Sequence, residues 1–170
     1  TARSQRSSNV LRTYRLLAEG TELITGRSVG EKIGQGKARV ILDLREIDLF
    51  QEGEILVTNR TDPDWQPIMK KASAIVTNTG GRVCHAAIVA REMGIPAIVG
   101  CGNATKVIRS GQDITVSCAS GETGRVYQGL IPYQVEEISL DNLPHTRTQI
   151  MMNVGNPEGV FALSTLPNDG

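Results

Sequence analysis

The amino-acid sequence predicts a domain of the α/β class in which mixed sheets are combined with few helices. Eighteen glycines among 170 residues are typical of a turn-rich fold rather than of a helical bundle. Short runs rich in β-branched residues alternate with glycine turns, as strands do. A strand–helix–strand succession over residues 73–100 indicates a parallel crossover, whereas residues 113–127 are typical of an antiparallel hairpin.

Local signals along the chain predict the individual elements. Apolar residues at helical spacing, followed by Gly20, predict a connector helix within residues 1–20. Asp62 as N-cap and Pro63 at the first helical position predict a second helix. A third helix is expected from about Val83 to Gly94. The expected strands cover residues 38–42, 54–58, 73–77, 96–100, 113–117 and 124–128.

The chain is expected to contain one complete domain, residues 21–133. The polar stretch 134–147 predicts a linker, and residues 148–170 begin like the first strand and helix of another domain. Because the chain begins with Thr1 and ends inside this last pattern, we expect it to be a piece of a longer protein.

Composition argues against several classes of function. Eighteen basic and eighteen acidic residues cancel, which disfavours a nucleic-acid or membrane-surface binder with a basic face. Three cysteines without a CxxC pair disfavour a disulfide framework and a zinc site, so we expect no metal site in this chain. No apolar run is long enough to span a membrane, and a cytoplasmic location is expected.

The stretch TNTGGRVCHAAIVAREMG, residues 77–94, places a histidine just after two glycines, at the start of a helix. Gly80 and Gly81 lack Cβ, so the backbone there can turn sharply and come close to a ligand. The free N–H groups and the dipole of a helix start suit a phosphate. They also disfavour imidazolium, which leaves His85 neutral and nucleophilic. From these residues alone, a structural role for His85 remains open.

Continued through GIPAIVGCG, this stretch resembles the phosphohistidine segment of the PEP-utilising enzymes. That family includes phosphoenolpyruvate synthase, pyruvate phosphate dikinase and enzyme I of the sugar phosphotransferase system. IGQGKARVI, TDPDWQPIMKKASAIVTN and the final IMMNVGNPEGVFALSTLPNDG are similar to the family too, and the pattern is most like the synthases. The resemblance implies a swivelling β/β/α phosphohistidine domain with layered parallel and antiparallel sheets and helices.

The resemblance also implies a function. An ATP-binding domain of the same full-length chain would phosphorylate His85. The domain would then swing, about hinges near residues 1–20 and 134–147, to a PEP/pyruvate-binding barrel that starts at residues 148–170. There it would pass its phosphoryl group to pyruvate. These two domains are the expected partners, Mg²⁺ is expected in them, and this chain alone is not expected to complete the reaction.

The candidate phosphate-binding residues beside His85 are Thr79, Gly80, Gly81, Arg82 and Cys84. Val83 departs from the family pattern, which has Ser, Thr or Asn two residues before the histidine. Three alternatives stay open: a dikinase or another PEP-utilising phosphotransferase, a non-catalytic swivelling interaction domain, which Val83 would favour, and a thiol enzyme that uses Cys84.

Other residues that resemble functional motifs have simpler interpretations. Helix capping explains Asp62 and Asp64 better than a carboxylate pair for metal or acid–base chemistry does. Gly34 and Gly36 are expected in turns rather than in a phosphate-binding P-loop, whose pattern fails at Ala38. Arg91 is expected to have a structural role. Cys101 and Cys118 are expected to be small buried apolar residues.

Overall fold

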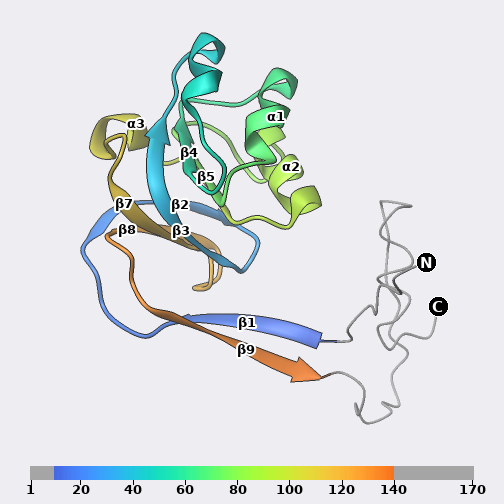
Figure 1. Cartoon of the computed structure of the whole chain (residues 1–170). Coiled ribbons are helices and arrows are strands. Elements are labelled where there is room, and N and C mark those ends of the chain that lie inside the picture. Colours follow the sequence, from blue (N-terminus) through green and yellow to red (C-terminus); the bar gives the residue numbers. More distant parts are fainter. Residues whose placement is uncertain (1–9, 140–170) are drawn as a thin grey trace, which may run out of the picture. The chain divides into compact units, whose positions relative to one another are not determined.

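The computed structural model describes residues 10–139, which are coloured in Figure 1. The chain divides into two compact units. One is Thr13–Val135, and the other combines residues 1–12 with 136–170. The unit Thr13–Val135 contains the barrel and the helices.

Seven strands of the unit Thr13–Val135 close into a barrel in the order β2-β6-β5-β4-β3-β7-β8. β3, β4, β5 and β6 are parallel to one another. The pairs β2–β6, β2–β8, β7–β8 and β3–β7 are antiparallel. The strands are β2 (Glu22–Val29), β3 (Ile33–Val40), β4 (Ile55–Thr58), β5 (Ala74–Thr77), β6 (Ala97–Val99), β7 (Asp113–Ser117) and β8 (Thr123–Gln128).

Helical segments lie between the parallel strands along the chain, except α3, which follows β6 and precedes β7, and Figure 1 shows α1 and α2 together on one side of the parallel strands. The segments are η1 (Leu44–Leu49), η2 (Pro63–Trp65), α1 (Gln66–Met69), α2 (His85–Met93) and α3 (Ala104–Val107). Asp62 caps η2, because its Oδ1 accepts from the Asp64 N–H at 3.1 Å. Gly94 ends α2 in the left-handed conformation. Both capping predictions are therefore confirmed.

Two hydrophobic clusters define the layers. Ile55 and Val57 of β4 point into the barrel, where they join residues of β7 and β8 such as Val116 and Val126. Leu56, between them, points to the other side and packs with residues of α1 and α2. An antiparallel layer, a parallel layer and a helical layer follow one another, which confirms the predicted β/β/α fold class.

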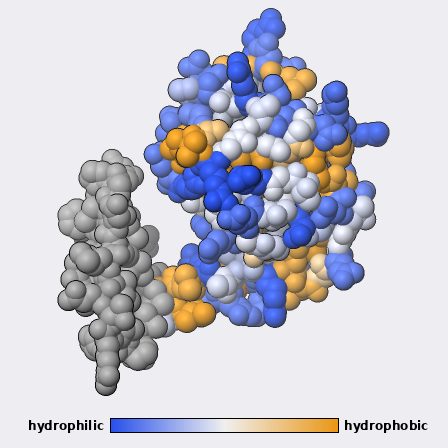
Figure 2. All heavy atoms as spheres, turned by 180° about the vertical axis from the view of Figure 1, so that it is seen from behind, coloured by the Kyte–Doolittle hydropathy of each residue, from blue (hydrophilic) through white to orange (hydrophobic). Residues whose placement is uncertain are grey.

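Large apolar side chains are also exposed at scattered positions, Val83 at 84% and Leu42 at 65% among them. On the face in Figure 2, hydrophobic residues form separate patches among hydrophilic ones. Single exposed apolar side chains are normal in folded domains, so we assign no docking surface to them.

The expectation that Gly34 and Gly36 lie in turns is wrong, because both lie inside β3. A Cβ on Gly34 would lie 2.6 Å from the Ser73 carbonyl oxygen. One on Gly36, whose φ is +159°, would lie 2.6 Å from the Gly53 carbonyl oxygen. Each glycine thus serves the close approach of a neighbouring backbone, which is the usual role of glycine within a strand.

The predicted connector helix is also wrong where the structure describes it, since Val10–Leu16 form strand β1. β1 pairs with β9 (Tyr133–Ser139) in a two-stranded sheet. The rings of Tyr14 and Tyr133 lie 6.2 Å apart between centroids. Pairing with a strand distant in sequence outweighs local helical spacing here. The predicted linker 134–147 begins as part of β9, and its remainder and the predicted barrel start 148–170 lie outside the described residues.

Candidate functional site: the start of helix α2

His85 is the first residue of α2 and is half-buried. The residue before it, Cys84, has the extended backbone of an N-cap, but no side chain caps the helix. The first N–H groups of a helix lack intrahelical partners, so this helix start presents uncapped donors beside the imidazole. The predicted position of His85 in the first helical turn is confirmed.

The two glycines of the preceding loop have different roles. Gly80 has a φ of +128°, and a Cβ there would lie 2.8 Å from Cys84 Sγ. A Cβ on Gly100, just after β6, would lie 2.8 Å from the Gly80 carbonyl oxygen. The loop is therefore packed between the helix start and the end of β6. A Cβ on Gly81 would meet nothing within 4 Å, which leaves the space beside Gly81 open.

The imidazole of His85 has one side-chain hydrogen-bond partner in the described part of the chain. Its Nδ1 lies 3.2 Å from Thr61 Oγ1. Thr61 follows β4, and the loop before His85 follows the neighbouring parallel strand β5. Carboxyl ends of adjacent parallel strands meet at one edge of a sheet, where ligand sites of α/β folds gather.

Sequence reasoning missed Thr61. Its position after the buried strand 55–58 was the available signal, because residues that follow neighbouring parallel strands meet at one edge of the sheet.

The candidate Thr79 holds the loop rather than facing the histidine. Its backbone N–H donates to the Asn59 carbonyl oxygen at 3.0 Å, and its hydroxyl donates to the same oxygen at 3.1 Å. The Thr79 carbonyl oxygen in turn accepts from the Thr77 hydroxyl at 2.8 Å. These bonds fix the loop after β5 to the loop after β4, which places Thr61 and His85 side by side.

The candidate Arg82 is exposed and forms an ion pair with Glu122, which precedes β8. Its carbonyl oxygen accepts from Arg91 Nη1 at 2.6 Å. Arg91 thus ties the last turns of α2 to the loop at its start, which agrees with the structural role expected for it. The Arg82 guanidinium is committed to Glu122 in this arrangement.

The cysteines differ in their surroundings. Cys84 is half-buried and packs against Gly80. Burial raises the pKa of Cys101 to about 12 and that of Cys118 to about 11. A thiol with so high a pKa is almost wholly protonated at neutral pH, so neither is a nucleophile. Although Cys84 precedes His85 directly, the side-chain hydrogen-bond partner of the His85 ring is Thr61 and not the Cys84 thiol.

Within residues 10–139 no three His, Cys, Asp or Glu side chains gather in a way that suits a metal ion. The same residues contain no helix that is long and apolar enough to cross a membrane. The start of α2 itself offers the imidazole and the uncapped N–H groups of the first turn.

Comparisons with known proteins identify relatives of this chain. The mobile domain of PEP-utilising enzymes matches residues 50–121, which include His85. The chain is 60% identical over 170 residues to the phosphoenolpyruvate synthase of Synechocystis sp., 59% over 175 residues to that of Aquifex aeolicus and 52% over 161 residues to that of Escherichia coli. These alignments cover 100%, 100% and 95% of this chain, but 21%, 20% and 20% of the relatives.

The chain thus spans about a fifth of the length of the curated relatives it matches. A solved structure of an enzyme I protein is 32% identical, covers 46% of this chain and 32% of that chain, and has a TM-score of 0.39. The fold assignment rests on the strand pairing and the layers described above. Together, the matched mobile domain and the identity to synthases over the whole chain establish that this chain belongs to the PEP-utilising enzymes.

Proposed function

We propose that this chain is the phosphocarrier domain of a phosphoenolpyruvate synthase and that His85 carries the phosphoryl group. The contact of His85 Nδ1 with Thr61 Oγ1 is the observation that most directly supports this role. A threonine oxygen that accepts the Nδ1 proton leaves the lone pair of the neutral ring on Nε2. Nε2 is then the nucleophile, next to a helix start that favours negative charge.

The proposed transfer has three steps that balance. The Nε2 lone pair attacks the β-phosphorus of ATP, and the N–P bond forms as the P–O bond to AMP breaks, so that AMP leaves with the electron pair. Water then attacks the outer phosphorus, the P–O–P bridge breaks, and phosphate leaves while one phosphoryl group stays on Nε2. In the last step the enolate oxygen of pyruvate attacks the phosphorus bound to Nε2, and the N–P electrons return to Nε2. The ring holds its Nδ1 proton against Thr61 throughout.

Backbone groups hold the phosphoryl oxygens in this proposal. The N–H groups of the first turn of α2 have no side-chain cap. Val83, at 84% exposure, has no hydroxyl to offer, and the Thr79 hydroxyl donates to Asn59. A helix start stabilises a nearby anion by about 0.3–1 kcal/mol, and by up to about 2 kcal/mol where it is partly buried.

The rest of the reaction belongs to other parts of the full-length protein. Because the relatives are about five times as long as this chain, we propose that an ATP-binding domain and a PEP/pyruvate-binding barrel flank it and hold Mg²⁺. The overall reaction would convert ATP, pyruvate and water to AMP, phosphoenolpyruvate and phosphate. Three free cysteines fit a cytoplasmic location, where thiols stay reduced.

The test is transfer of label to the histidine. The chain is mixed with the ATP-binding domain of a synthase, Mg²⁺ and ATP labelled on the β-phosphate. We expect acid-labile, base-stable label on the chain, and none on His85→Ala. Cys84→Ser is the matched control and should accept label at the parent rate. Label on His85→Ala would contradict the proposal, and loss of label in Cys84→Ser would favour the thiol alternative.

A further inference from the structure

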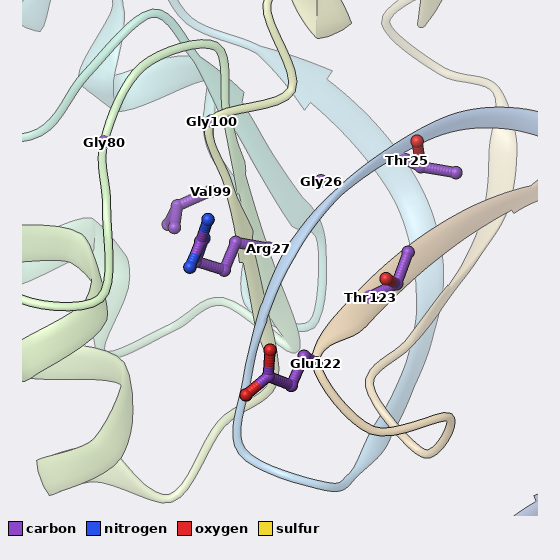
Figure 3. A pocket seen from close by; sticks show the side chains of 8 residues that line it. All are labelled: Thr25, Gly26, Arg27, Gly80, Val99, Gly100, Glu122 and Thr123. Carbon is purple, nitrogen blue, oxygen red and sulfur yellow. The ribbon is translucent and has the colours of Figure 1, made fainter.

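A hollow of about 480 Å³ lies outside the barrel (Figure 3). It lies between β2 and the glycine loop, which is the segment 78–84 between β5 and α2. Gly26 of β2 and Gly124 of β8 face the interior, because a Cβ on either would lie within 2.7 Å of the Ile98 side chain. Alternation along the strands then turns Arg27 and Thr123, which are register partners, to the outer face. His85 does not line this hollow, although Gly80 does.

The charges around the hollow favour an anion. Among residues 10–139, the Arg27 guanidinium has no ion-pair partner. Glu122 is the carboxylate that lines the hollow, and it is already paired with Arg82. The hydroxyl groups of Thr25 and Thr123, both exposed, have no hydrogen-bond partner within the described residues. The lining therefore presents one free positive charge and two free hydroxyl groups.

Figure 3 shows how these groups lie. The Arg27 side chain extends from β2 beside Val99, on the side of the hollow where Gly80 lies. Thr25 and Thr123 lie on the other side of β2 in this view. A ligand whose anionic group meets Arg27 thus has the glycine loop as its neighbour, and the rest of the ligand extends along the strand face to the two hydroxyl groups.

We propose that this hollow binds a small phosphate ester, with the phosphate on Arg27 and a hydroxyl-bearing body against Thr25 and Thr123. The planar guanidinium matches phosphate oxygens in a two-pronged hydrogen bond. A volume of about 480 Å³ exceeds what a single phosphate fills and lies in the range of small-molecule sites. The site is separate from the phosphoryl group on His85.

The position of Glu122 predicts in which direction the affinity for the ester should change when this residue is substituted. Its carboxylate repels a bound phosphate and pairs with the Arg82 guanidinium. Glu122→Gln removes the repulsion and frees a second guanidinium at the rim. This variant should therefore bind the ester more tightly, by roughly 2- to 5-fold, since exposed charges are screened by salt.

The experiment is a titration of the 170-residue chain with glycerol 3-phosphate, followed by amide NMR. We expect the amide signals of Gly26, Gly80 and Gly100 to shift. Arg27→Gln should weaken binding by about tenfold or more, as loss of a charge-assisted pair does. Arg109→Gln, which removes an exposed guanidinium after α3, is the matched control and should bind like the parent.

Further arms separate this site from the phosphocarrier site. His85→Ala should bind glycerol 3-phosphate like the parent, whether or not His85 proves to accept phosphoryl groups. Inorganic phosphate should bind more weakly, and glycerol should not compete. The proposal is overturned if Arg27→Gln binds like the parent, if shifts gather only in the first turn of α2, or if no shift occurs. Equal affinity for inorganic phosphate would overturn the ester assignment.

Discussion

His85 Nδ1 and Thr61 Oγ1 lie 3.2 Å apart, although they follow two different parallel strands. If this contact fixes the tautomer, Thr61→Val should lose it while keeping the side-chain volume. We expect phosphorylation of His85 to slow by about 3- to 10-fold, the value of one hydrogen bond, and Thr61→Ser to retain the parent rate. Nitrogen-15 NMR of the ring would check the proton position. An unchanged tautomer and rate in Thr61→Val would remove Thr61 from the mechanism.

The glycine pair provides a matched comparison. Gly80→Ala puts a Cβ 2.8 Å from Cys84 Sγ at a φ of +128°, and should destabilise the fold by about 1–3 kcal/mol. Gly81→Ala enters open space without a left-handed φ, and should change stability by no more than about 0.5 kcal/mol. Urea unfolding measures both variants. Equal losses of unfolding free energy in the two variants would show that the tight packing at Gly80 does not contribute to the stability of the fold.

The ion pair of Arg39 and Glu54 predicts a pH dependence of stability. Burial alone would raise the pKa of Glu54, but hydrogen bonds from Arg39 and from the Gln51 backbone lower it below its ordinary 4.5. A lowered pKa in the folded state stabilises the protein above about pH 4.5, and this contribution is lost as the pH falls further. Glu54→Gln should flatten that part of the stability curve, measured by urea unfolding between pH 3 and 7.

Removing Arg39 gives the companion measurement. Arg39→Ala leaves a carboxylate with 9% side-chain exposure unpaired, and should cost about 1–3 kcal/mol at neutral pH. Lys37→Ala breaks the exposed pair with Asp113 instead, and should cost less than about 1 kcal/mol. A larger effect of Lys37→Ala than of Arg39→Ala would contradict this ranking of the two pairs.

Thiol chemistry should distinguish the three cysteines. At pH 8, we expect a thiol reagent to modify Cys84 first, because burial raises the pKa of Cys101 to about 12 and that of Cys118 to about 11. Three thiols should react after unfolding. Mass spectrometry of the modified peptides would locate the label. Rapid modification of Cys118 in the native protein would contradict the burial of its side chain.

Local signals predicted most of the helical layer, for identifiable reasons. Asp62, Pro63 and Gly94 act within one turn of their helices, so the sequence alone locates those ends. The same holds for His85 at the start of α2. β5 and β6 were recognisable because each is a short run of buried apolar residues.

Contacts between distant segments were not predictable in this way. β2 has Gly26 at its centre and polar residues on both sides, and its pairing with β6 and β8 makes it a strand. η1 and α3 were missed too, as short segments with weak patterns. The pair Thr61–His85 joins the loops of two parallel crossovers, and the pair Arg82–Glu122 joins one of these loops to the turn between β7 and β8. Such pairs follow from the strand order, which the sequence pattern did not establish.

Closure of the seven strands has a consequence for how such a domain can work beside its neighbours. Every strand of the ring has a hydrogen-bonded neighbour on each side, so none is left to recruit a strand from another polypeptide. A partner that binds the barrel must therefore contact its side chains and loops. Such a partner can dissociate without breaking hydrogen bonds between backbone strands. A module built this way can touch and release partners repeatedly while its own framework stays intact.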